Sequence, residues 1–443
     1  MTIHLNRRHL LLSGAGLALA GCANGITPAE AAQRLPSTQA AMDRHVAAGH
    51  VPGISVGVRM PDGQDVFLEA GSLDFDGAAA ADEDTLWRIY SMTKPVTGAA
   101  AALLIEDGVL TLDTPVAQFI PEFANLTVVT DRTSGLDARP ATRTMTVRHL
   151  LTHTAGFTYH FFGDQPVANA YSRAGIFPVT GYNLSPREID GPKVRDLDAM
   201  ARALADIPLM YEPGTEYLYS ISLDVLGLVI QRASGMSFPD FVQRRLFNPI
   251  GMDDTVWRLR GAGDRRRFAA LYNYADGGRQ VVDPVAETAY AEPVTLFAGG
   301  AGLVSSTRDY LAFLTTILDD GRAGRVRVMT PETARLIRSD ILPEGVNPEN
   351  GAFRFGFGGG VGLPDGDTPG EFGWGGAAGT QGWLDPVRRT AGTIMLQQFG
   401  QSAPVAGDVR AASRRTSPRL REAPRPKSVQ LDAVQLGSDF GPV

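Results

Sequence analysis

Ser91 and Lys94 are the residues whose types and spacing most directly suggest chemistry. Residues three apart lie on one face of a helix, so the hydroxyl and the amine would be neighbours. Serine becomes a nucleophile when an adjacent group takes its proton, and a desolvated lysine can do this because its pKa falls readily. Lysine occurs only at positions 94, 193 and 427. Alone, the spacing is a weak indication, because Lys94 could equally be a surface lysine of a helix.

A buried helix is expected to carry this pair. The stretch from Ser91 to Glu106 is rich in Ala and Leu, with Pro95 near its first turn and Gly108 just past its end. Proline is favoured at the start of a helix and glycine just after it, so both boundaries agree with a helix. The N-terminus of that helix would also favour negative charge developing on the Ser91 oxygen.

Strands at both ends of the chain enclose a mostly helical middle. Residues 54–60 and 65–70 flank a Pro-Asp-Gly turn and predict a hairpin. Residues 371–376, 381–385 and 390–398 predict an antiparallel meander. Helices are expected at 37–49 behind Ser37, at 223–233 before Gly235, at 238–246 behind Ser237, at 306–318 with Ser306 and Asp309 at its start, and after Thr330. This order predicts an α+β fold in which distant segments complete one sheet.

Seven short segments occur along the chain in a characteristic order. They are Val51-Pro52-Gly53, Tyr90-Ser91-Met92-Thr93-Lys94-Pro95, Glu106-Asp107-Gly108, His149-Leu150-Leu151-Thr152-His153-Thr154-Ala155-Gly156, Glu212-Pro213-Gly214, Tyr219-Ser220 and Trp374-Gly375-Gly376. Together they resemble the serine β-lactamase and penicillin-binding-protein superfamily, in particular class C β-lactamases and the β-lactamase-fold carboxylesterases called family VIII. The resemblance covers residues 37–400. It implies a β-lactamase/DD-peptidase-like fold: an antiparallel sheet flanked by helices, from 37–88 and 285–400, plus a mainly helical subdomain from 89–284.

The resemblance also implies roles for individual residues. Tyr219 would share the proton traffic of Ser91 with Lys94, although a helix-flanking core aromatic is the other interpretation of this tyrosine. The backbone N–H groups of Ser91 and Ala377 would form the oxyanion hole. The reaction implied is a two-step acyl transfer through Ser91, with no cofactor and no metal.

Two departures from the family pattern bear on the substrate. Ile221 stands where the family resemblance leads one to expect an asparagine. Trp374-Gly375-Gly376 replaces the Lys-Thr-Gly of the β-lactamases that the chain resembles. The positive charge that binds a carboxylate is therefore missing, and an aromatic wall suits an uncharged group better. A small-molecule ester is favoured over a lactam. A β-lactamase or D-alanyl-D-alanine carboxypeptidase, and a non-catalytic envelope binding protein, remain the alternatives.

Three other patterns favour structural roles. Gly53-Ile54-Ser55-Val56-Gly57 matches the nucleophile elbow of a different hydrolase fold, but Ser55 lies inside a predicted strand and no histidine follows His160. His149 and His153 lack the glutamate of a zinc-binding H-E-x-x-H helix. The glycine run from 356 to 362 lacks the register of a phosphate-binding loop and is expected to be a close-packed strand.

The N-terminus predicts export. Arg7-Arg8 precede an apolar run from 10 to 19, followed by Leu19-Ala20-Gly21-Cys22, which resembles a bacterial lipobox. We expect a signal peptide over 1–21, lipidation of Cys22, a linker over 22–36, and a lipoprotein of the cell envelope whose only membrane attachment is this anchor. A plain secretory signal is the alternative, and twin-arginine and general export are equally compatible. Cys22 is the only cysteine and the net charge is −7, so a disulfide framework and nucleic-acid binding are not expected.

The composition changes after Gly400. Arginines and prolines alternate without a sustained apolar period, which predicts a disordered tail over 401–443. Members of the resembling family usually end in a helix packed on the sheet. Without that helix one face of the sheet would be exposed, and we expect low stability or solubility.

Overall fold

A seven-stranded antiparallel sheet is the largest unit of the computed structural model, which describes residues 26–163, 165–178, 193–275, 278–400 and 403–416. Its strand order is β11-β12-β13-β14-β15-β1-β2. The bounds are β1 Gly53–Arg59, β2 Asp65–Gly71, β11 Arg354–Phe355, β12 Gly360–Val361, β13 Phe372–Gly375, β14 Gln381–Asp385 and β15 Thr390–Met395. Ser55 of β1 lies opposite Met395 of β15. The predicted hairpin, the predicted meander and their union in one sheet are therefore confirmed.

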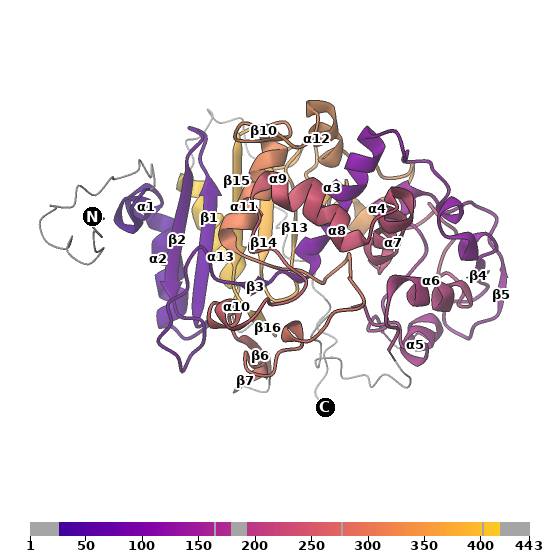
Figure 1. Cartoon of the computed structure of the whole chain (residues 1–443), viewed down its shortest axis with the longest axis horizontal. Coiled ribbons are helices and arrows are strands. Elements are labelled where there is room, and N and C mark those ends of the chain that lie inside the picture. Colours follow the sequence, from indigo (N-terminus) through magenta and orange to yellow (C-terminus); the bar gives the residue numbers. More distant parts are fainter. Residues whose placement is uncertain (1–25, 164, 179–192, 276–277, 401–402, 417–443) are drawn as a thin grey trace, which may run out of the picture.

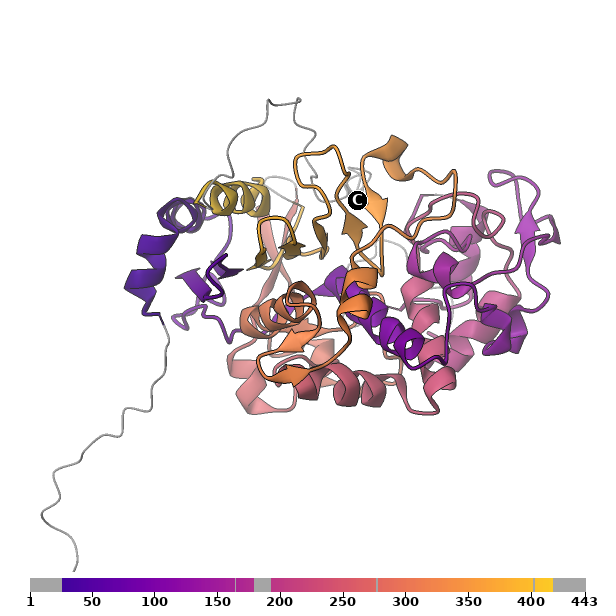
Figure 2. The same cartoon turned by 90° about the horizontal axis from the view of Figure 1, so that it is seen from above.

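Helices from both ends of the chain cover one face of this sheet. They are α1 (Pro28–Arg34), α2 (Pro36–Ala47) and α13 (Val405–Thr416), and Figure 2 shows the yellow α13 beside the indigo α2. Buried Val56 and Ile394 on the strands belong to one hydrophobic cluster with Val409 of α13. The other face is covered by α11 (Thr307–Leu318), which approaches β1 closely because position 57 is glycine.

Two expectations for the chain ends are wrong. Disorder was expected from 401 onward, but residues 405–416 form α13, whose Val405, Val409 and Ala412 are buried on the sheet. These three apolar residues follow the helical spacing of four and three, but the neighbouring arginines hide the pattern in the sequence. The sheet face expected to be exposed is thus covered. The expected linker over 22–36 likewise contains α1, which begins with a Thr27–Glu30 capping box.

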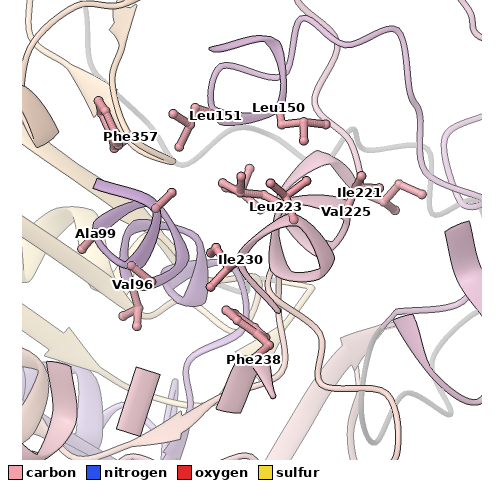
Figure 3. Close-up of a cluster of buried hydrophobic side chains, with 14 of the residues drawn as sticks. Val96, Ala99, Leu150, Leu151, Ile221, Leu223, Val225, Ile230, Phe238 and Phe357 are labelled. Carbon is pink, nitrogen blue, oxygen red and sulfur yellow. The ribbon is translucent and has the colours of Figure 1, made fainter. Parts of the chain in front are cut away.

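Helix α3 (Thr93–Glu106) passes through the centre of the molecule. It packs against α7 (Ser222–Ser234) on one side and meets β13 on the other. Small residues along α3, such as Ala99, are fully buried and let these neighbours approach. Figure 3 shows Val96 and Ala99 on α3 and Leu223 and Ile230 on the neighbouring α7, and all four belong to the buried cluster that forms the main core. The glycine at the end of α7, Gly235, has the left-handed backbone expected of a helix C-cap.

The region expected to be helical contains further short strands (Figure 1). Its helices are α4 Val147–Leu151, α5 Pro166–Arg173, α6 Leu197–Ala205, α8 Phe238–Val242, which continues through a π-helical turn Gln243–Phe247 into α9 Asn248–Ile250, and α10 Ala262–Arg266. β4 Thr127–Val129 pairs with β5 Ala138–Pro140, and β6 Leu271–Ala275 pairs with β7 Gly278–Asp283 and with β16 Gln398–Phe399.

The remaining elements link the two parts of the molecule. β3 Trp87–Arg88 pairs with β8 Val304–Ser305, β9 Arg322–Ala323 pairs with β10 Val326–Arg327, and α12 is Pro331–Ile337. Short 3-10 turns cover Tyr90–Met92, Val116–Gln118, Pro121–Phe123, Ala289–Ala291 and Pro348–Gly351. Across the described ranges, no helix has the length and apolarity needed to cross a bilayer.

Candidate active site

Ser91 and Lys94 lie in hydrogen-bonding contact at the start of α3. Ser91 is in the 3-10 turn Tyr90–Met92 that precedes the helix, and the Lys94 Nζ atom is 3.1 Å from the Ser91 Oγ atom. Lys94 is fully buried, whereas Ser91 is half-buried. An amine held this close to a partly accessible hydroxyl can take its proton. The predicted pair is therefore formed.

The backbone that leads into Ser91 is fixed by close contacts. Ile89 lies two residues before Ser91, and its carbonyl oxygen contacts Gly376 at the end of β13. A Cβ atom at position 376 would lie only 2.4 Å from this oxygen, so only glycine permits the contact. Tyr90 has a positive φ of 41°, which is unfavourable for a non-glycine residue and persists only where surrounding contacts impose it. Three residues ahead, buried Arg88 bonds Asp283 through Nε at 2.7 Å.

A glycine-rich loop between the 3-10 turn Ala289–Ala291 and β8 contacts the lysine from the side opposite Ser91. The Lys94 Nζ atom donates to the Gly300 carbonyl at 2.8 Å. The same loop is tied to α3 by Thr97, whose hydroxyl donates to the Gly299 carbonyl at 2.7 Å, and by the Leu303 N–H, which donates to Thr93 Oγ1 at 3.2 Å. These bonds fix the direction in which the amine points.

Tyr219 reaches the same amine from the segment before α7. The Lys94 Nζ atom lies 4.5 Å from the centroid of the Tyr219 ring, and the indole N–H of Trp374 donates to the Tyr219 hydroxyl at 3.1 Å. Tyr219 is half-buried and packs against the main hydrophobic core, with its ring beside the Lys94 amine. Residues 91, 94, 219 and 374 are thus brought together from the central helix, the helical part and the sheet.

His153 holds the segment that carries Tyr219. The His153 carbonyl accepts from the Leu218 N–H at 2.9 Å, its Nδ1 accepts from the Ser220 N–H at 3.2 Å, and its ring lies 4.6 Å from the Tyr219 ring. Burial, with a smaller contribution from the Lys94 charge, lowers the pKa of His153 well below its usual value. A neutral imidazole is needed to accept at Nδ1, so this environment suits its supporting role.

Two residues of the site escaped the sequence analysis. Tyr159 lies 5.7 Å from Lys94 Nζ, measured from its ring centroid, and burial raises the pKa of its phenol well above the usual value. Tyr159 therefore stays protonated. Asp224 lies on α7, and its carboxylate accepts from the Gly300 N–H at 2.8 Å. Its signal in the sequence is an acidic residue inside an otherwise apolar helix stretch, Leu223 to Ile230.

Aromatic side chains form a wall beside Tyr219. Trp374 lies 5.7 Å from the Tyr219 ring and 5.1 Å from Phe355. On the other side, Phe161 stacks on Tyr159 at 4.7 Å and Phe162 lies 6.5 Å from Tyr219. Trp374, Phe161 and Phe162 are only half-buried, so their rings are available to a ligand.

The remaining predicted site residues lie at the end of β13. Gly375 closes the strand, Gly376 begins a turn in which its N–H donates to the Thr380 carbonyl at 2.8 Å, and Ala377 is half-buried in that turn. Because Gly376 rests on the Ile89 carbonyl, Ala377 is held next to the turn that contains Ser91. Cys22 lies outside the described residues.

The three patterns for which the sequence favours structural roles are Gly53–Gly57, the His149–His153 pair and the glycine run, and each makes structural contacts. Ser55 lies in β1, and its buried hydroxyl accepts from Thr307 at 2.7 Å. His149 Nδ1 accepts from the Thr146 N–H at 3.2 Å and completes the cap of α4. The glycine run was expected to be one strand, but only Gly360–Val361 (β12) is extended, and the residues before it form the β11–β12 turn. A side chain at Gly358 in this turn would lie 2.4 Å from the Lys94 carbonyl, so the expected close packing is present against α3.

Comparison with known sequences gives consistent matches. The family model described as Beta-lactamase matches residues 38–414. Protein Rv1367c of Mycobacterium tuberculosis is 34% identical over 387 residues, which cover 83% of this chain and 91% of that protein. Esterase EstB of Burkholderia gladioli is 32% identical over 264 residues, which cover 56% of this chain and 60% of that protein.

Solved structures agree with the sequence matches. EstCE1, described as a hydrolase with promiscuous acyltransferase activity, superposes with a TM-score of 0.70 at 25% identity, covering 86% of this chain and 99% of that one. Simvastatin synthase from Aspergillus terreus superposes with a TM-score of 0.69 at 23% identity, covering 86% and 97% of the two chains, and shows the fold alone.

The antiparallel sheet, the helical part and the serine–lysine pair at the start of the central helix define a serine hydrolase of the β-lactamase and penicillin-binding-protein fold. The chain belongs to the β-lactamase family.

Proposed function

We propose that the protein hydrolyses carboxylic esters through a covalent acyl-enzyme on Ser91. The observation that carries this proposal is the 3.1 Å contact between Lys94 Nζ and Ser91 Oγ, with Tyr219 against the same amine. Ser91 Oγ attacks the ester carbonyl while its proton passes to Lys94 or Tyr219. The C–O bond of the tetrahedral intermediate then breaks, and the alcohol leaves with that proton. Water attacks the acyl-enzyme, releases the acid and restores the Ser91 hydroxyl.

The oxyanion that forms in both steps needs hydrogen-bond donors. We assign this role to the backbone N–H groups of Ser91 and Ala377, which belong to neighbouring turns held together by Gly376. Donors fixed before the reaction stabilise developing charge without reorganising, which is commonly worth a large part of the rate enhancement. Trp374, Gly375 and Gly376 would line the substrate beside these donors.

Esters are favoured over lactams because of the side chains around the site. β13 presents Trp374 and two glycines, and the other described lysine, Lys193, lies over the Phe177 ring. A penicillin carboxylate would therefore meet no lysine other than the one bound to Ser91. Phe161 and Phe162 extend the apolar surface, which suits an ester with an aromatic or large apolar group. EstB and the lovastatin esterase of Penicillium rubens, both relatives of this chain, are named as esterases.

Turnover of a short-chain nitrophenyl ester by the purified protein tests the proposal. Ser91→Ala and Tyr219→Phe should each reduce kcat by at least about a hundredfold, because each removes a group that moves the reacting proton or electron pair. Ser55→Ala is the matched control, since Ser55 is a buried serine in β1. Unchanged turnover in Ser91→Ala would refute the assignment.

A chromogenic cephalosporin measured beside the ester separates the nearest alternative. Faster turnover of the cephalosporin would identify a β-lactamase or D-alanyl-D-alanine carboxypeptidase on the same fold. Absence of turnover of both compounds, together with absence of Ser91 labelling by a fluorophosphonate probe, would favour a non-catalytic binding protein.

We further propose that the protein is exported to the bacterial cell envelope and anchored by lipid at Cys22. The support is the sequence alone, Arg7-Arg8 and the Leu19-Ala20-Gly21-Cys22 segment. Mass spectrometry of the protein from its native membrane fraction should find a diacylated N-terminus at Cys22. Cys22→Ser should release the protein from that fraction.

A further inference from the structure

Asp224 is a buried carboxylate behind Lys94 that the reaction outlined above leaves unused. It lies in the first turn of α7 and is 1% exposed. Its Oδ1 accepts from the Gly300 N–H at 2.8 Å, while its Oδ2 is buried without a hydrogen-bond partner in the described part of the chain. An unpartnered buried oxygen is costly, so a function for this carboxylate is expected.

Gly300 connects Asp224 to Lys94. Its N–H donates to Asp224, and its carbonyl accepts from the Lys94 Nζ atom at 2.8 Å. A side chain at position 300 would place its Cβ 2.5 Å from Asp224 Oδ2, so the glycine lets the loop lie directly against the carboxylate. A continuous chain of contacts thus runs from α7 through this loop to the amine beside Ser91.

The charged and titratable groups that face Asp224 come from two neighbouring elements. Lys94 faces it from α3, and Tyr159 faces it from the segment after α4. Burial raises the pKa of Asp224 to about 7, against the opposing effect of the Lys94 charge. The N-terminus of α7 favours the ionised form. This carboxyl therefore changes its charge near neutral pH while Lys94 works beside it.

We propose that Asp224 is a positioning residue for Lys94, which it orients through Gly300 and whose charged form it favours. This inference rests on the proposed ester hydrolysis. The Lys94 charge opposes the rise of the Asp224 pKa, and the same attraction acts in return from the ionised carboxylate on the Lys94 charge. Removing the acceptor for the Gly300 N–H frees the carbonyl that aims the amine at Ser91.

Two variants separate these effects. Asp224→Asn keeps the oxygen that accepts from Gly300 and removes the charge, so the acidic limb of the kcat/KM profile should move to lower pH while KM stays unchanged. Asp224→Ala also removes the acceptor and should lower kcat about a hundredfold at unchanged KM, as misplaced catalytic groups do. Asp309→Asn is the matched control, because Asp309 is a buried aspartate of α11 that accepts from the Asp254 N–H and the Thr255 hydroxyl.

Coincident acidic limbs in wild type and Asp224→Asn, or an equal shift in Asp309→Asn, would overturn the proposal. If Asp224→Asn does not fold, infrared titration of the protonated carboxyl band replaces it, comparing wild type with Lys94→Met. Loss of the lysine should move the titration of one carboxyl to higher pH, and an unchanged titration overturns the proposal. Failure of the proposed function would appear separately, as wild type without turnover and without fluorophosphonate labelling of Ser91.

Discussion

The indole N–H of Trp374 donates to the Tyr219 hydroxyl at 3.1 Å, which joins the aromatic wall of the sheet to the tyrosine of the helical part. A fixed donor directed at the phenol oxygen stabilises negative charge that develops on that oxygen while the serine proton is being transferred. The wall residue is therefore expected to contribute to the chemical step as well as to substrate contact.

Trp374→Phe should lower kcat roughly tenfold, the effect of losing one such hydrogen bond. Trp383→Phe is the matched control. Gly373 pairs with Trp383 and Trp374 pairs with Gly382, so the two tryptophans lie on opposite faces of the sheet. Steady-state kinetics on a nitrophenyl ester measures both. Equal kcat in the two variants would show that the indole N–H plays no part.

The aromatic wall should select the substrate. Phe161→Ala and Phe162→Ala are each expected to lower kcat/KM for a nitrophenyl benzoate roughly fivefold, because a ring contact of this kind contributes about 1 kcal/mol. The same variants should retain kcat/KM for nitrophenyl acetate, whose acyl group is too small to reach the wall. Phe75→Ala, which removes a ring packed on Tyr272, serves as the control. Parallel losses for both esters would contradict selection by the wall.

The ion pairs of α13 should be needed for stability. Glu371, immediately before β13, binds Arg410 at 2.5 Å and Arg414 at 2.7 Å. Glu371→Gln would leave Arg410 largely buried without its counter-charge, at a cost of about 3 kcal/mol in the free energy of unfolding. Chemical denaturation measures this loss, and a variant as stable as wild type would refute it.

Truncation tests the same helix by removing it whole. A chain ending at residue 400 lacks α13 and exposes the apolar cluster around Ile394, so it should melt earlier or aggregate. A chain ending at residue 416 retains every described contact of α13 and should melt like wild type. Similar melting of the two truncated chains would show that α13 does not support the sheet.

Stability should fall on mild acidification because of His149. Burial, with the charges of Arg143 and Arg148, lowers its pKa to about 4. The folded state then binds fewer protons than the unfolded state between pH about 6.5 and 4. The stability is therefore present above this range and is lost as pH falls through it, by about 3 kcal/mol in total.

His149→Gln tests this assignment. The variant keeps an acceptor for the Thr146 N–H but does not titrate, so its melting temperature should depend less on pH over the same range. Thermal denaturation of both proteins in matched buffers provides the measurement. Identical slopes would place the acid sensitivity in another group.

Sequence alone determined the features that depend on local pattern. The alternation of β1 and β2, the turn between them, and the proline and glycine at the ends of α3 are local, so these elements could be predicted. The order of the short motifs indicated the family, and the family resemblance predicted that strands from both ends of the chain join in one sheet. No single segment specifies these long-range contacts. Ser91, Lys94 and Tyr219 were found in this way.

Only the tertiary structure decided what depends on contacts between distant segments. Asp224 and Tyr159 join the site because α7 and the segment after α4 pack against α3, and their burial has no local signature strong enough to identify them. The arginine-rich composition of the α13 segment predicted disorder. The helix is stabilised by Glu371 and by the apolar face of the sheet, which are distant in sequence and become neighbours only in the fold. A charged segment can be stabilised by partners far along the chain, and that information is carried by the fold.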